Sequence, residues 1–127
     1  MCEWVFPISP IAASRPRVSK HGAYFAGPYK EFRKAMIDLV PIVLGDGFFP
    51  YTGPLSVDVE VYVKHPKKTK LSAPRADIDN YLKAIFDCLN GSLWEDDKQI
   101  HKVYAAKQWA DKFSDGYFTI GVEEIKV

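Results

Sequence analysis

The fold is decided by the stretch Arg75-Ala76-Asp77-Ile78-Asp79-Asn80-Tyr81-Leu82-Lys83-Ala84-Ile85-Phe86-Asp87. From Ile78 the apolar residues recur at helical spacing, at positions 82, 85, 86 and 89, which predicts a helix with one buried face. Asp77 and Asp79 flank its first turn, where free backbone N–H groups favour negative charge. Lys83 follows Asp79 by one helical turn on the same face. The stretch therefore predicts a helix whose start carries two carboxylates.

More acidic residues follow this helix than its structure requires. The cluster Glu95-Asp96-Asp97 comes shortly after it. Packed carboxylates repel one another unless a cation lies among them, and hard divalent ions such as Mg²⁺ prefer carboxylate oxygens. Two interpretations stay open from spacing alone: a divalent metal site, or an acidic helix start followed by a solvated acidic turn.

Length and composition indicate one ordered domain over residues 1–127. The chain has 127 residues, of which 47% are hydrophobic, and this is enough for a single core. Cys2 and Cys88 are too few and too far apart for a disulfide framework or a metal knuckle. No apolar run reaches the roughly 18 residues of a membrane span, and the N-terminus lacks a signal-peptide pattern. We expect a cytoplasmic protein without a membrane partner.

The net charge of +1 conceals a segregation of charge along the chain. Basic residues gather between positions 15 and 34 and between 64 and 75, whereas acids gather between 77 and 97. A basic surface around an acidic pocket suits a polyanion that is held by its phosphates, although basic loops can also be merely soluble. The candidate DNA contacts are Arg15, Arg17, Lys20, Lys67, Lys68, Lys70 and Arg75.

The remaining elements predict an α+β fold. Residues 3–8 form an edge strand, 14–22 a loop, and a helix begins at Pro28 and is broken or kinked at Pro41. Strict alternation predicts a strand over 55–63; strands over 99–109 and 117–127 form a hairpin around Asp115-Gly116. The order β-α-β-α-β-β indicates a mixed sheet with two main helices on one face. In this arrangement we expect Asp77, Asp79 and Asp97 to lie side by side.

Two blocks of this sequence resemble a known family. They are Asp77-x-Asp79-Asn80-x-x-Lys83-x-x-x-Asp87 and Trp94-x-Asp96-Asp97, and together they are similar to the RusA-type Holliday junction resolvases between about Arg75 and Val103. The resemblance implies a homodimeric endonuclease that resolves four-way DNA junctions by paired symmetric nicks during recombination and repair. Its implied cofactor is Mg²⁺, for which Mn²⁺ can substitute, and its implied setting is a bacterial or phage-infected cell.

The resemblance also implies roles for individual residues. Asp77, Asp79 and Asp97 correspond to the metal-binding carboxylates, and Lys83 to the essential lysine. Asp96 is a weaker candidate for the metal site, and Asp87 would orient Lys83. The structural alternative for Lys83 is an i,i+4 ion pair that contributes a few tenths of a kcal/mol. For Trp94 we expect burial beneath the acidic turn.

Three further functions remain open at this point. The first is a metal nuclease that acts on other branched or linear DNA, and the second is a DNA-binding module that does not cut. The third is an acidic protein–protein surface without a nucleic-acid role, against which the clustered lysines argue. The first is distinguished by comparing branched with linear substrates. The second would hold DNA equally well in EDTA.

Overall fold

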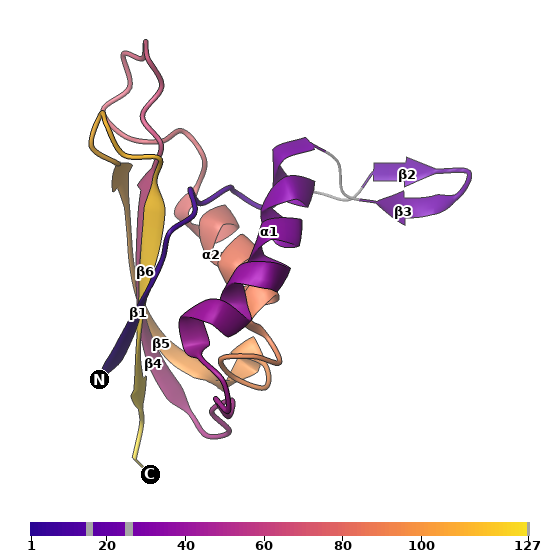
Figure 1. Cartoon of the computed structure of the whole chain (residues 1–127), viewed down its shortest axis with the longest axis vertical. Coiled ribbons are helices and arrows are strands. Elements are labelled where there is room, and N and C mark those ends of the chain that lie inside the picture. Colours follow the sequence, from indigo (N-terminus) through magenta and orange to yellow (C-terminus); the bar gives the residue numbers. More distant parts are fainter. Residues whose placement is uncertain (15–16, 25–26, 127) are drawn as a thin grey trace.

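The computed structural model describes residues 1–14, 17–24 and 27–126, and its main feature is a four-stranded mixed sheet (Figure 1). The strands are β1 (Cys2–Phe6), β4 (Leu55–Val63), β5 (Ile100–Trp109) and β6 (Tyr117–Glu124), in the order β1-β6-β4-β5. β5 is parallel to β4, whereas β6 is antiparallel to both β4 and β1. Both helices cover one face of this sheet (Figure 1). The predicted α+β architecture is confirmed.

Strand β4 is one of the two inner strands of the sheet, and one of its faces is apolar along most of its length. Leu55, Val57, Val59 and Val61 are buried, and the residues between them are half-buried and mostly polar. This alternation places the apolar face against the helices and leaves the other face of the sheet open. The core therefore lies between the sheet and the helical layer.

The helical layer consists of α1 (Gly27–Leu44) and α2 (Ile78–Leu89). The buried residues of α1 recur at helical spacing and are Tyr29, Phe32, Met36 and Val40; those of α2 are Tyr81, Ala84, Ile85 and Leu89. Pro41 does not break α1, contrary to one of the two predicted outcomes. The helix continues to Leu44, because Pro41 is exposed and its carbonyl still accepts a hydrogen bond from Gly45 N at 3.0 Å.

A small hairpin replaces part of the loop predicted over 14–22. β2 (Arg17–Ser19) pairs antiparallel with β3 (Gly22–Tyr24), and the pair projects away from the main sheet (Figure 1). Strands of three residues carry too few side chains to show a periodic pattern, so the hydrophobic pattern does not predict them. The loop prediction was wrong for these residues.

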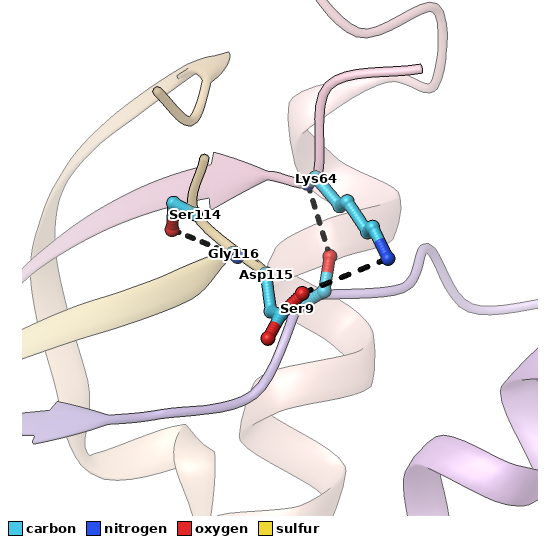
Figure 2. Close-up of polar contacts among 5 residues, drawn as sticks. All are labelled: Ser9, Lys64, Ser114, Asp115 and Gly116. Carbon is cyan, nitrogen blue, oxygen red and sulfur yellow. Dashed lines mark hydrogen bonds and ion pairs between the residues drawn. The ribbon is translucent and has the colours of Figure 1, made fainter. Parts of the chain in front are cut away.

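The predicted hairpin between the last two strands was also wrong. β4 lies between β5 and β6, so the connection between these two strands crosses the end of β4. Two contacts hold this crossing: Ala110 N donates to Val63 O at 2.8 Å, and Lys64 Nζ lies 3.7 Å from Asp115. Beside them Lys64 N donates to Ser9 Oγ at 3.1 Å, which ties the segment after β1 to the same end of β4 (Figure 2). β4 offers two edges for pairing, and a connection of this length can reach the far edge.

Helix α2 runs back along the sheet after β4. It starts near the end of the sheet where β4 finishes and ends near the point where β5 begins (Figure 1). No helix in the described ranges is long and apolar enough to cross a membrane.

Candidate active site

Asp77 and Asp79 are both exposed at the start of α2. Asp77 occupies the N-cap position with an extended backbone (φ −69°, ψ 146°), and its carbonyl accepts from Asn80 N at 3.1 Å. Within the described part of the chain, however, its carboxylate makes no capping hydrogen bond. An N-cap aspartate commonly uses its side chain in this way. The Asp77 carboxylate therefore stays available for a ligand.

Two hydrogen bonds fix the turn that carries these carboxylates. Lys107 Nζ, from β5, donates to Ala76 O at 2.8 Å, and Ala13 N donates to Asn80 O at 2.9 Å. The sequence analysis missed Lys107. The available signal was its register, because Lys107 pairs with Val61 and so shares the helix-covered side of the sheet. A lysine at such a position needs a polar partner, which here is the carbonyl before Asp77.

Asp97 lies beyond the other end of α2, in a short 3₁₀ turn over Asp97–Gln99. Asn90 links the helix to this turn: its Nδ2 donates to Asp97 Oδ2 at 3.4 Å, and its Oδ1 accepts from Trp94 Nε1 at 2.6 Å. Trp94 is fully buried, as predicted. Asn90 also escaped the sequence analysis, since Asn-Gly after a helix was interpreted only as its end.

Asp96 forms two hydrogen bonds within the acidic turn itself. Its Oδ1 accepts from Lys98 N at 2.9 Å, and its own N–H donates to Gln99 Oε1 at 2.9 Å, which forms a capping box. The Gln99 amide in turn donates to Tyr51 O and Gly53 O. Asp96 therefore holds the acidic turn in place.

The acidic residues do not gather in one chain, contrary to our expectation. α2 has 12 residues, which gives it a length of about 18 Å and separates Asp77 from Asp97 by a similar distance. Among the described residues no group of three or more His, Cys, Asp or Glu side chains is arranged to hold a metal ion. The expectation failed because β5 begins beyond the C-terminal end of α2, so the whole helix separates Asp97 from Asp77 and Asp79.

The side chain of Lys83 is directed toward the C-terminal end of α2. Its Nζ lies 3.4 Å from Asp87 Oδ2, and the lysine side chain is 66% exposed. This is the i,i+4 pair that the spacing predicts. An exposed pair of this kind contributes only a few tenths of a kcal/mol to stability, so it leaves Lys83 free to change partners.

Cys88 on α2 and the Tyr29–Arg33 pair on α1 lie near Asp87, and the Cys88 thiol is not a nucleophile at neutral pH. Burial raises the pKa of the Cys88 thiol to about 11, and Arg33 opposes this shift only partly. The Tyr29 hydroxyl accepts from Arg33 Nη1 at 3.2 Å and raises the pKa of the guanidinium. Cys88 thus stays a thiol, and Arg33 keeps its positive charge close to Asp87.

The candidate DNA contacts are distributed over two regions. Lys67, Lys68, Lys70 and Arg75 are exposed in the segment between β4 and α2, and Lys20 is exposed at the tip of the small hairpin. Arg15 lies outside the described residues. The backbone of Arg17 belongs to β2, but its side chain also lies outside what is described.

Comparison with known proteins places this arrangement in a family. YqaN of Bacillus subtilis (strain 168), itself uncharacterized, is 33% identical over 75 residues, which cover 48% of this chain and 53% of the relative. The chain thus spans about half the length of that relative. The family described as Endodeoxyribonuclease RusA matches residues 7–116, which include both ends of α2 and the acidic turn. The chain belongs to the RusA endodeoxyribonuclease family.

Proposed function

We propose that this protein is a Mg²⁺-dependent endonuclease that resolves four-way DNA junctions by paired symmetric nicks in recombination and repair. Its setting would be the cytoplasm of a bacterial or phage-infected cell. Membership of the RusA endodeoxyribonuclease family supports the reaction class. The observation that carries the proposal is that Asp77, at the N-cap of α2, leaves its carboxylate without a capping role beside the exposed Asp79.

The donor chemistry of these side chains suits a hard divalent cation. Exposed carboxylate oxygens are ligands that Mg²⁺ and Mn²⁺ accept. When bound, such an ion supplies charge stabilisation at the phosphoryl oxygens and an activated water. Asp77 and Asp79 would hold the ion, while the bond from Lys107 to Ala76 O keeps their turn in position. Lys83 would exchange Asp87 for the phosphate or the attacking water.

The separation of the carboxylates supports a site shared between two protomers. Asp97 lies about 18 Å from Asp77 in one chain, one helix length away. In a twofold dimer, Asp97 of one protomer can approach Asp77 and Asp79 of its partner, and symmetry then produces two equivalent sites. Two such sites match the two equivalent strands that a four-way junction presents.

The direct test is cleavage of a labelled four-way junction beside a linear duplex of the same sequence, with and without Mg²⁺. Wild-type protein should introduce paired symmetric nicks in the junction alone. Asp79→Asn should abolish cutting and leave junction binding largely intact, because the amide keeps the shape of the side chain and removes its charge.

Each other outcome identifies a different function. Equal cutting of junction and duplex would indicate a general metal nuclease. Tight binding in EDTA without cutting in any divalent metal would indicate a DNA-binding module. Loss of folding in Asp79→Asn, measured by circular dichroism, would make Asp79 structural.

A further inference from the structure

A hollow with a strongly basic lining lies at the end of the sheet where β4 finishes. Its volume is about 650 Å³, and its lining residues are His65, Lys67, Lys68, Thr69, Lys70 and Lys112. All but Lys112 belong to the segment after β4; Lys112 belongs to the connection between β5 and β6. The sequence analysis missed Lys112, because the predicted hairpin did not bring this connection over the end of β4.

Contacts between the two segments keep the hollow in shape. The ring of His65 meets that of Trp109 edge to face at 5.4 Å, and Trp109 Nε1 donates to Leu71 O at 3.0 Å. Lys64, at the start of the segment after β4, also pairs with Asp115 in the connection between β5 and β6 (Figure 2). Trp109 and Lys107 are two residues apart on β5, so the same strand supports both the hollow and the turn before Asp77.

The positive charge of the hollow is not neutralised within the described chain. None of its four lysines forms an ion pair with a described carboxylate. The nearest acid in sequence, Asp111, uses Oδ1 to accept from the backbone N–H of Lys112 at 2.8 Å. Lysines that are free of carboxylate partners are suited to phosphate groups.

Phe113 follows Lys112 directly and is 100% exposed. It stands on an ordered turn, in which Ser114 N donates to Asp111 O at 2.9 Å. A phenylalanine without buried surface does not stabilise the fold through burial. An aromatic ring beside a cationic groove, however, is a combination that binds unstacked bases of single-stranded nucleic acid.

We propose that the basic hollow and Phe113 together bind a DNA strand where its bases unstack, as they do at a branch point. The lysines hold the phosphates, and Phe113 stacks on a base whose stacking is interrupted at the branch point. This inference rests on the proposed function for its ligand class, DNA, and adds a site that selects branched DNA over linear duplex.

The test compares Phe113→Ala with Phe49→Ala in the full-length protein. Phe49 is 86% exposed and serves as a matched control. It belongs to the connection between α1 and β4, which lies at the opposite end of the sheet (Figure 1). Dissociation constants are measured in EDTA for a four-way junction and for linear duplex. A second junction carries 2-aminopurine at the branch point, where stacking quenches its fluorescence.

Phe113→Ala should weaken junction binding at least about fivefold and lose the quenching, with duplex binding unchanged, since one stacked base contributes on this scale. Phe49→Ala should match wild type on both DNAs. Junction binding and quenching that are unchanged in Phe113→Ala would overturn the inference. Unchanged binding by Phe113→Ala would not contradict the proposed function as long as the wild type cuts junctions in Mg²⁺. A Phe113-dependent junction affinity without any cutting would support the inference and contradict the nuclease.

Discussion

Asp96 and Asp97 are adjacent in the sequence, yet their side chains have different surroundings. Asp96 accepts from Lys98 N and completes a capping box with Gln99. Asp97 contacts Asn90 Nδ2 at 3.4 Å, a long bond that leaves most of its carboxylate free. This difference separates a residue that shapes the acidic turn from one that can serve as a ligand.

The pair Asp96→Asn and Asp97→Asn tests that distinction. Asparagine caps a helix about as well as aspartate, so Asp96→Asn should change the free energy of unfolding by less than about 0.5 kcal/mol and retain junction cleavage. Asp97→Asn should remain folded and lose cleavage, because the charge of the proposed ligand is gone. Initial rates of junction cleavage in Mg²⁺ are compared for the two variants and the wild type. Equal loss of activity in both variants would show that Asp96 belongs to the metal site.

At the scale of the elements, local sequence patterns predicted which helices and strands form, but not always the position of each strand in the sheet. The alternation of β4 and the helical spacing of α2 are properties of neighbouring residues, and both elements were confirmed. The insertion of β4 between β5 and β6 depends on long-range pairing. Asp115-Gly116 has the composition of a hairpin turn, but Gly116 is needed there because a side chain would collide with Ser9.

The prediction of the candidate site had the same limit: it identified residues from local spacing and missed long-range contacts. The spacing of Asp77, Asp79 and Lys83 identified the residue types and the helix that carries them. It did not show that β5 begins near the C-terminal end of α2, which keeps Asp97 away from Asp77 and Asp79. Lys107 and Lys112 join the site region only through tertiary contacts, so the sequence could not connect them with it.

Gly116 allows three segments to meet at the end of β4. Its φ is +93°, and a Cβ at this position would lie 2.7 Å from Ser9 Oγ and 3.0 Å from Lys64 N. Gly47 has a similar φ of +77° with no atom within 4 Å of such a Cβ. The two glycines thus share the backbone conformation and differ in the space around them.

We expect Gly116→Ala to lower the free energy of unfolding more than Gly47→Ala. Gly47→Ala should cost about 1 kcal/mol through its backbone conformation, and Gly116→Ala about 1–3 kcal/mol more through the added contact. Urea denaturation followed by tryptophan fluorescence measures both. Equal losses would show that Ser9 and Lys64 move away without cost.

At the scale of the whole molecule, opposite charges lie on different surfaces. The open face of the sheet carries Glu3, Asp58 and Glu60 around a small hollow of about 150 Å³. The lysines Lys67, Lys68, Lys70 and Lys112 gather at the end of the sheet where β4 finishes. The first surface would repel the proposed DNA ligand and the second would attract it, so we expect DNA to approach the end of the sheet that leads into Asp77.

The proposed site shared between protomers is based on the same overall geometry. One helix length separates Asp97 from Asp77 and Asp79, and a twofold axis is the simplest way to bring such groups together twice. If the site is shared in this way, we expect activity to depend on dimer formation even though each chain carries all three carboxylates.

The most direct test is junction cleavage by a heterodimer of Asp77→Asn and Asp97→Asn protomers, purified through two different affinity tags. Each homodimer should be inactive. If the sites are shared, the heterodimer contains one site with both substitutions and one with neither, so it should cut a four-way junction in Mg²⁺ by single nicks. A heterodimer as inactive as either homodimer, beside an active wild-type dimer with the same tags, would contradict the shared site.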